Sequence, residues 1–150
     1  MTKLDVIGQA HIANILLVED NEDDVFLTRE AFKAGGLRVN LYHVNNGVKC
    51  LQFLRKEGAY SDAPVPDLIL LDMHMPMMNG QEVLAEIVKD PQLQHLPVVI
   101  LTTSHEAADI RKMYKLRCNS YITKPVDFES FTKLISELTG YWLTVVKLQE

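Results

Sequence analysis

Acidic, hydroxyl and cationic side chains stand where several short apolar runs of the chain end. In chain order, these polar residues are Glu19, Asp20, Asp72, Thr102 and Lys124. A carboxylate at the end of a buried run must be paired, or it takes up a proton. Their chemistry therefore depends on whether the fold brings them together.

If these side chains meet, the set has a definite chemistry. Carboxylates in one crevice repel each other and require a cation, and hard oxygen ligands favour Mg²⁺ with a phosphate as co-ligand. The ammonium of Lys124 can hold a second phosphate oxygen, and the hydroxyl of Thr102 can hold a third. Asp72 can then act as a nucleophile toward phosphorus and form an aspartyl phosphate. The residue types therefore indicate phosphoryl transfer.

The elements that must position these residues are short and alternate along the chain. Leu-rich and β-branched runs without polar alternation are typical of parallel strands covered on both faces. The predicted strands are 14–19, 39–44, 68–72, 98–103 and 120–123, and the predicted helices are 23–34, 47–56, 80–89, 106–115 and 128–140.

Helix caps support these boundaries. Asn46, Ser104 and Asp127 can each cap a following helix, and Asn79 with Glu82 three residues later indicates a capping box. In the second helix, the residues expected to face inward are Val48, Leu51 and Leu54.

A strand followed by a helix, five times over, predicts an α/β fold: a (βα)5 doubly wound five-stranded parallel sheet. In such sheets the ligand site lies outside the carboxyl ends of the strands, which is where the polar residues stand.

The composition is that of one ordinary globular domain. The chain has 150 residues, 47% hydrophobic and 23% charged, which is enough to bury a full core. A net charge of −5 argues against a general nucleic-acid binder. Cys50 and Cys118 form no C-x-x-C pair and no signal peptide is visible, so we expect a cytoplasmic protein. The apolar runs are too short to span a membrane.

A series of motifs resembles a known family. The motifs are LLVEDNEDD, PDLILLDMHMP, LPVVILTTSHEAADI, YITKPVDFESF and the tail YWLTVVKLQ. In this order they resemble the receiver domain of bacterial response regulators, which has a flavodoxin-like fold, and especially the small stand-alone regulators of cyanobacterial phytochromes. We therefore expect a receiver domain at 14–140, an N-terminal extension at 1–13, and an apolar tail at 141–150 that belongs to the domain or to a dimer interface.

The resemblance implies a role for each residue of the set. Asp72 would accept a phosphoryl group from a kinase histidine, Lys124 would pair with that group, and Thr102 would donate a hydrogen bond to it. The implied metal is Mg²⁺, and its implied ligands are Asp20, Asp72, the backbone carbonyl of His74 and, through water, Glu19.

The resemblance also implies a switch. Tyr121 would turn inward as Thr102 moves, although a plain core role for Tyr121 is an equal alternative. His74 and Ser104 stand two residues after Asp72 and Thr102, at positions that tune hydrolysis of the phosphoryl bond; their direction of effect stays open. The Lys124–Pro125 peptide bond would be cis.

Partners are expected to be proteins. The resemblance implies a sensor histidine kinase, specifically a phytochrome, with no nucleic acid and no membrane. Apolar residues in the tail need a groove on the same domain or on a partner, and the relatives imply a homodimer through the last helix and the tail. The residues expected on this surface are Phe128, Phe131, Tyr141, Trp142, Leu143 and Val145. The basic residues Arg111, Lys112, Lys115 and Arg117 have a simpler interpretation as a solvated face.

Two other function classes compete with a signalling role. A phosphohydrolase of the haloacid dehalogenase type needs a second Asp two residues after its nucleophile, and His74 stands there instead. A flavodoxin-like binding module that accepts no phosphate would not need a complete acceptor site. The sequence therefore predicts a signalling protein that catalyses only its own phosphoryl transfer and slow dephosphorylation.

Overall fold

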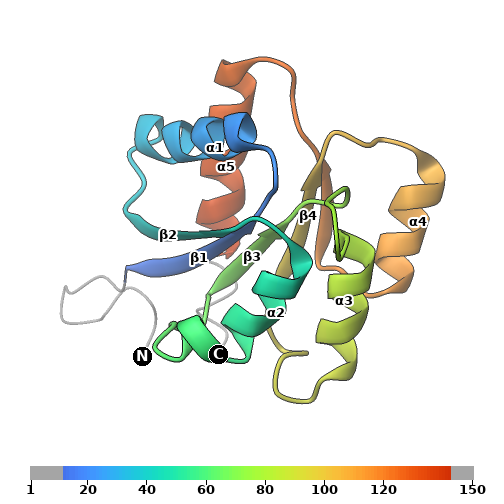
Figure 1. Cartoon of the computed structure of the whole chain (residues 1–150). Helices are drawn as coiled ribbons and strands as arrows, with labels where there is room; N and C mark the ends of the chain where they lie inside the picture. Colours follow the sequence, from blue (N-terminus) through green and yellow to red (C-terminus); the bar gives the residue numbers. More distant parts are fainter. Residues whose placement is uncertain (1–11, 143–150) are drawn as a thin grey trace.

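A five-stranded parallel sheet forms the centre of the molecule (Figure 1). The structure is a computed structural model and describes residues 12–142. The strands are β1 (Ala13–Val18), β2 (Val39–Val44), β3 (Leu68–Leu71), β4 (Val98–Thr102) and β5 (Ser120–Thr123). Their order is β2-β1-β3-β4-β5, and every neighbouring pair is parallel. The predicted fold class is confirmed.

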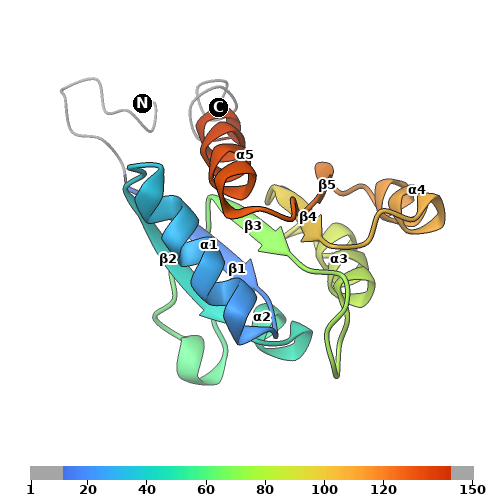
Figure 2. The same cartoon turned by 90° about the horizontal axis from the view of Figure 1, so that it is seen from above.

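Helices cover both faces of this sheet. They are α1 (Glu22–Ala34), α2 (Gly47–Leu54), α3 (Gly80–Lys89), α4 (Ala107–Lys115) and α5 (Phe128–Gly140), with a short 3-10 turn, η1, at Gly58–Tyr60. Helices α1 and α5 lie side by side on one face, and α2 and α3 lie on the other (Figures 1 and 2). Within residues 12–142, no helix is both long enough and apolar enough to cross a membrane.

Alternate residues of each strand enter two separate cores. In β1, Leu16 and Val18 pack with α2 and α3, whereas Ile15 and Leu17 pack with α1 and α5. Because both faces of the strand are buried, the sequence shows a continuous apolar run instead of a polar alternation. The central strands stay buried up to their last residue, and the polar residues of the site begin directly after them.

Most predicted caps are present. The side chain of Asn46 accepts from the backbone N–H of Lys49, and that of Asp127 accepts from the N–H of Ser130. Asn79 and Glu82 form the complete capping box. These caps fix where α2, α3 and α5 begin.

Two local predictions were wrong. Glu106, and not Ser104, holds the N-cap position of α4, and the Ser104 hydroxyl instead donates to the carboxylate of Asp109 at 2.6 Å. A carboxylate is a stronger acceptor than a backbone group, and the loop before α4 places the Ser104 hydroxyl within reach of Asp109. Val48 is 39% exposed, whereas Leu51 and Leu54 are buried as expected.

Two glycines let the loop after β3 pass close to the helices. A Cβ on Gly80 would collide with the carbonyl oxygen of Asp72, and a Cβ on Gly47 would collide with the carbonyl oxygen of Met78. The backbone N–H of Gly80 donates to Met73 at 3.0 Å, and that of Gly47 donates to Met78 at 3.2 Å. The starts of α2 and α3 therefore hold the loop that follows Asp72 from both sides.

Candidate functional site

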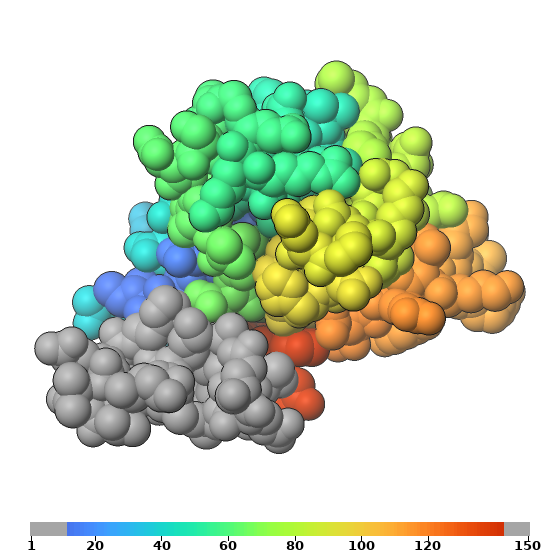
Figure 3. Space-filling model, turned by 90° about the horizontal axis from the view of Figure 1, so that it is seen from below, coloured from blue at the N-terminus to red at the C-terminus, as the bar shows by residue number. Residues whose placement is uncertain are grey.

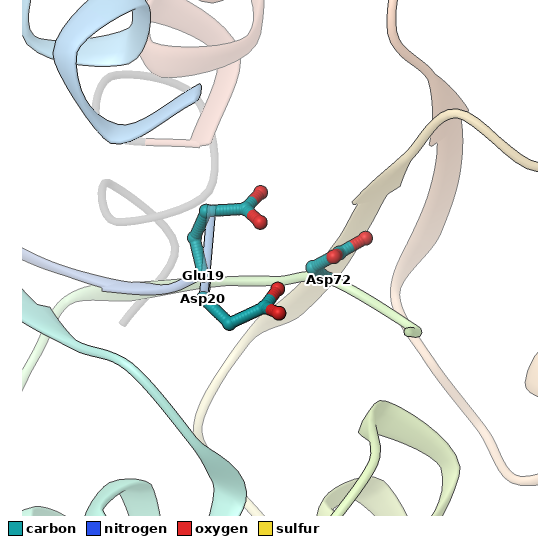
Figure 4. A group of neighbouring side chains, drawn as sticks. All are labelled: Glu19, Asp20 and Asp72. Atoms are coloured by element: carbon teal, nitrogen blue, oxygen red, sulfur yellow. The ribbon is translucent and has the colours of Figure 1, made fainter. Parts of the chain in front are cut away.

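Three carboxylates gather at the carboxyl edge of the sheet (Figure 4). Glu19 and Asp20 follow β1, and Asp72 follows the neighbouring strand β3. One oxygen from each side chain lies within 4.8 Å of the others. Glu19 and Asp72 are buried, and Asp20 is exposed to solvent. Such an oxygen set, open on one side, fits a hard divalent cation that keeps several waters.

Lys124 joins this group from the end of β5. Its ammonium donates to Glu19 at 2.6 Å and to Asp24, on the first turn of α1, at 3.1 Å. Only 9% of the Lys124 side chain and 3% of the Glu19 side chain are exposed, so the pair is buried.

The two partners of this pair respond differently to their environment. Burial, with a smaller effect from the charge of Asp72, raises the pKa of Glu19 to about 7 against the opposing effect of Lys124. Burial by itself would lower the pKa of Lys124, but the hydrogen bond and charge of Glu19 outweigh it, so this pKa is raised. The site therefore keeps a cation beside Asp72.

A hydroxyl network lies at the ends of β4 and β5. Thr102 is fully buried, and its hydroxyl oxygen accepts from the backbone N–H of Ser104 at 3.4 Å. The Tyr121 hydroxyl donates to the Ser104 carbonyl at 2.9 Å, and the Tyr121 backbone N–H donates to the Tyr114 hydroxyl at 3.0 Å. Together with the Ser104–Asp109 bond, these contacts join the loop after β4 to α4 and β5.

Comparison with known proteins decides the family of this site. Residues 15–136 match the response regulator receiver domain. The chain is a response regulator. It is 40% identical to the response regulator Rcp1 of Synechocystis sp. (strain ATCC 27184 / PCC 6803 / Kazusa) over 134 residues, which are 89% of this chain and 91% of Rcp1.

Solved structures of response regulators share the fold. The crystal structure of the phosphorylated cyanobacterial phytochrome response regulator RcpA is similar with a TM-score of 0.84 and 40% identity, over 89% of this chain and 96% of RcpA. The Mn²⁺-bound form of Rcp1 is similar with a TM-score of 0.81 and 39% identity, over 88% of this chain and 95% of Rcp1.

The remaining residues predicted for the receiver site surround its rim. The His74 side chain is exposed and lines a hollow of about 450 Å³ together with Ser104 and Asp109.

No peptide bond within residues 12–142 is cis, so the prediction for Lys124–Pro125 was wrong. Trans is the lower-energy form of most X-Pro bonds, and the N–H of Lys124 still donates to the Thr102 carbonyl as a continuation of the β4–β5 ladder.

The residues predicted for a dimer or partner surface divide into three groups. Phe128 is 43% exposed and Tyr141 is 55% exposed. Phe131 and Trp142 are buried in the core between α1, α5 and the sheet, so this chain covers them itself. Leu143 and Val145 lie outside the described residues.

Three residues of the response regulator site were not predicted from the sequence. Asp24 stands in the acidic first turn of α1, which suits the helix dipole, and it also contacts Lys124. Its position four residues before the buried Thr28, on the same helix face, was an available signal. Asp109 and Tyr114 gave no local signal, because their partners belong to the loop after β4 and to β5.

Proposed function

We propose that Asp72 is the phosphoacceptor of this response regulator and that a sensor histidine kinase supplies the phosphoryl group. The observation that carries the proposal is the meeting of Asp72 with Glu19, Asp20 and the Lys124 ammonium at one edge of the sheet. A transferred phosphoryl group brings negative charge to a site that is already acidic. Cations must therefore offset that charge. The three carboxylates offer a place for a metal cation, and the Lys124 ammonium supplies a second positive charge.

The proposed step transfers phosphorus from nitrogen to oxygen. A carboxylate oxygen of Asp72 attacks the phosphorus of a phosphohistidine, the P–O bond forms, and the P–N bond breaks with its electron pair returning to the imidazole. Lys124 holds one phosphoryl oxygen, and Thr102 donates its hydroxyl hydrogen to another. Because Thr102 is fully buried, the loop that follows it must shift for this bond to form.

The metal proposed for this site is Mg²⁺. Asp20, Asp72 and the backbone carbonyl of His74 would hold it directly, and Glu19 through water. When bound, Mg²⁺ neutralises charge on the transferring oxygens. The spacing of the three carboxylates fits a hard cation, and Rcp1 has a Mn²⁺-bound form, an ion with similar oxygen preferences.

An apolar groove beside the acceptor is the proposed docking place for the kinase. It measures about 250 Å³, and its exposed apolar side chains are Leu27, Val126 and Phe128. Asp24 and Lys124 line the same groove, so a kinase helix lying in it can bring a histidine to Asp72. We propose a phytochrome as this kinase, because RcpA is a cyanobacterial phytochrome response regulator.

Phosphate labelling tests the proposal. The chain is incubated with a phytochrome-type histidine kinase, labelled ATP and Mg²⁺, and in parallel with the small donor phosphoramidate. We expect label on the natural chain and on Asp62→Asn, an exposed acid that precedes β3, and none on Asp72→Asn. Label that persists in Asp72→Asn contradicts the acceptor assignment. Label from phosphoramidate but not from the kinase keeps the acceptor and rejects the kinase.

Phosphorylation is proposed to act through the hydroxyl network. If Thr102 moves to the phosphoryl group, its contact with Ser104 breaks. Ser104 is bonded both to the Tyr121 hydroxyl and, through Asp109, to α4. A surface on α4, β5 and α5 would then change its preferred arrangement. His74 and Ser104, at the rim, are proposed to set the lifetime of the phosphoryl group.

We also propose a symmetric homodimer through the end of α5 and the tail. The 13 residues of α5 span about 20 Å, so Phe128 at its start and Tyr141 after its end belong to separate surfaces. Phe128 lines the kinase groove, which leaves the exposed Tyr141 for the dimer. The domain limits 14–140 and the cytoplasmic location stay predictions.

A further inference from the structure

We infer that His43, on β2, is a positioning residue for the metal site at the end of β1. Its ring Nε2 lies 2.7 Å from the backbone carbonyl oxygen of Glu19, across two neighbouring strands. A carbonyl oxygen can only accept a hydrogen bond, so Nε2 carries the hydrogen and donates it. In the proposed function, on which this inference rests, Asp20 is a direct ligand of Mg²⁺.

The Glu19 carbonyl lies just beyond the last bond of the β1–β2 ladder. The N–H of Glu19 donates to the Val44 carbonyl at 3.1 Å. In a regular parallel ladder, the Glu19 carbonyl would then accept from the N–H of Asn46, two residues after Val44. The chain has left the strand by then, because β2 ends at Val44 and Asn46 is the N-cap of α2. The His43 ring therefore stands in for the ladder donor.

The same carbonyl belongs to the peptide group that joins Glu19 to Asp20. A peptide group is planar, so a bond that fixes its carbonyl also fixes the direction in which the Asp20 backbone continues. On the other side of Asp20, the N–H of Asn21 donates to the Glu19 carboxylate at 3.2 Å, and the Asn21 side chain caps α1. Asp20 therefore lies between two peptide groups that are each held by a side chain.

The Asp20 carboxylate depends on this backbone for its position. Its side chain is exposed, and within residues 12–142 it has no hydrogen-bond or ion-pair partner of its own. One of its oxygens lies within 4.8 Å of oxygens of Glu19 and Asp72, and Figure 4 shows the Asp20 and Asp72 carboxylates close together. Glu19 differs, because Lys124 holds its carboxylate directly. A change in the Glu19–Asp20 peptide should therefore move the Asp20 oxygens relative to the other two carboxylates.

A simpler role for His43 would be structural. A half-buried imidazole that only satisfies a backbone carbonyl would contribute to stability, and its loss would have no specific effect on metal affinity. Positioning instead makes metal affinity depend on a donor at the place of Nε2, whichever side chain carries it. Gln and Asn separate the two roles. The amide nitrogen of Gln stands as many bonds from Cβ as Nε2 does, and that of Asn stands one bond closer.

Titration calorimetry of the unphosphorylated full chain with Mg²⁺, and separately with Mn²⁺, tests the inference. We expect His43→Asn to raise Kd about tenfold, as loss of a partner that orients a metal ligand does, and His43→Gln to keep the natural Kd. His95→Asn is the matched control, because His95 is exposed in the segment between α3 and β4, at the opposite edge of the sheet. Figure 3 shows this segment in yellow on the face seen from below. Asp20→Asn, which tests the proposed ligand itself, should raise Kd for both ions.

A second measurement follows the peptide group in the metal-free chain. A hydrogen bond to a carbonyl polarises the N–H of the same peptide group, so the amide nitrogen NMR shift of Asp20 reports on the Glu19 carbonyl. In EDTA we expect this shift to change in His43→Asn and to return in His43→Gln. Urea unfolding of the same samples checks that each variant is folded. If His43→Asn does not fold, His43→Met takes its place, since Met keeps the length of the side chain and lacks an N–H donor.

Failure of this inference and failure of the proposed function give different results. A natural Kd in His43→Asn, together with weak binding by Asp20→Asn, overturns the inference and leaves the metal assignment intact. Weak binding by both His43→Asn and His43→Gln also overturns it, since the ring would then act by packing. An Asp20→Asn variant that binds as tightly as the natural chain overturns the metal assignment itself, and with it the role of His43.

Discussion

Lys124 is the residue whose charge holds the site together before phosphorylation. Its ammonium lies 2.6 Å from Glu19 and 3.1 Å from Asp24, and it also faces the charge of Asp72. If Asp72 is the acceptor, as proposed, a phosphoryl group on it would compete with Glu19 for the same cation. The transfer of Lys124 from Glu19 to the phosphoryl oxygens would then release Glu19 toward the metal side of the site.

We therefore expect Lys124→Gln to destabilise the chain. Removing one partner of a buried ion pair leaves the other charge unpaired, which costs about 3 kcal/mol in free energy of unfolding. Urea unfolding in EDTA measures the loss, and Lys133→Gln, an exposed lysine on α5, is the matched control. Equal stability of the two variants would show that the Glu19 contact contributes nothing to folding.

The two thiols give a second prediction at the same scale. Burial raises the pKa of Cys50 to about 12 and that of Cys118 to about 11, both above the 9.0 of an unperturbed cysteine. At pH 8 we therefore expect neither thiol to react with a thiol reagent such as DTNB until urea unfolds the chain, since the thiolate is the reactive form.

The same shifts set the sign of a pH effect. A group whose pKa is higher in the folded state stabilises that state below its unfolded pKa, and this contribution is lost as pH rises through the folded pKa. Stability should thus fall from about pH 9 toward pH 12. Rapid labelling of Cys50 in the native protein would contradict its burial, and Cys50→Ser and Cys118→Ser identify which thiol reacts.

At the residue scale, the sequence predicted which side chains gather at the site, but not the hydrogen-bond partner of each. Glu19, Asp20, Asp72 and Lys124 were predicted to converge because parallel strands share a carboxyl edge. The Lys124–Asp24 and Ser104–Asp109 contacts were not predicted, because they depend on side-chain directions that tertiary packing sets. The isomer of the Lys124–Pro125 peptide bond was also not predicted correctly.

At the scale of elements, the loop from Asp72 to Gly80 is held by the starts of two helices. Gly80 lies against the carbonyl of Asp72 and the backbone of Met73, and Gly47 lies against Met78. These close approaches make the position of Asp72, the proposed acceptor, depend on how tightly α3 and α2 pack against the end of β3.

We expect Gly80→Ala to move that loop. The added methyl overlaps the Asp72 carbonyl, and overpacking of this kind costs about 1–3 kcal/mol. Urea unfolding should show the loss, and labelling from phosphoramidate should be slower, because the acceptor is displaced. Gly140→Ala is the control, since nothing lies within 4 Å of a Cβ there. Unchanged labelling by Gly80→Ala would show that α3 does not position the acceptor.

Helix boundaries could be predicted to within two residues, because Asn46, Asn79 and Asp127 cap by rules local to the chain. For α4 the start was predicted to within one residue but the capping residue was wrong, because Ser104 bonds to a side chain and not to the helix backbone. The exposure of Val48 likewise depends on which side of α2 faces the sheet. In a helix of only eight residues, the apolar pattern defines the rotation of the helix about its axis poorly.

At the scale of the whole molecule, the sheet order places function on separate surfaces. The proposed acceptor Asp72 lies at the end of β3, which has β1 on one side and β4 on the other, and the proposed kinase groove lies between α1 and the start of α5. The fold could be predicted in full because short apolar runs alternating with capped helices allow few topologies. The surfaces were less predictable, since they depend on partners as well as on this chain.

The dimer is the remaining prediction at this scale, and Tyr141 is the residue that tests it. Its ring is 55% exposed just after α5, next to the buried Trp142, so the rest of residues 12–142 leaves it largely uncovered. We expect a dimer mass by sedimentation and light scattering, and a monomer for Tyr141→Glu, because a buried unpaired carboxylate opposes association. Phe26→Glu, at a ring 61% exposed on α1, should leave the dimer intact. The measurement is made with Asp72 free and phosphorylated. A monomer in both states at high concentration would exclude the dimer, and a dimer that survives Tyr141→Glu would place its interface elsewhere.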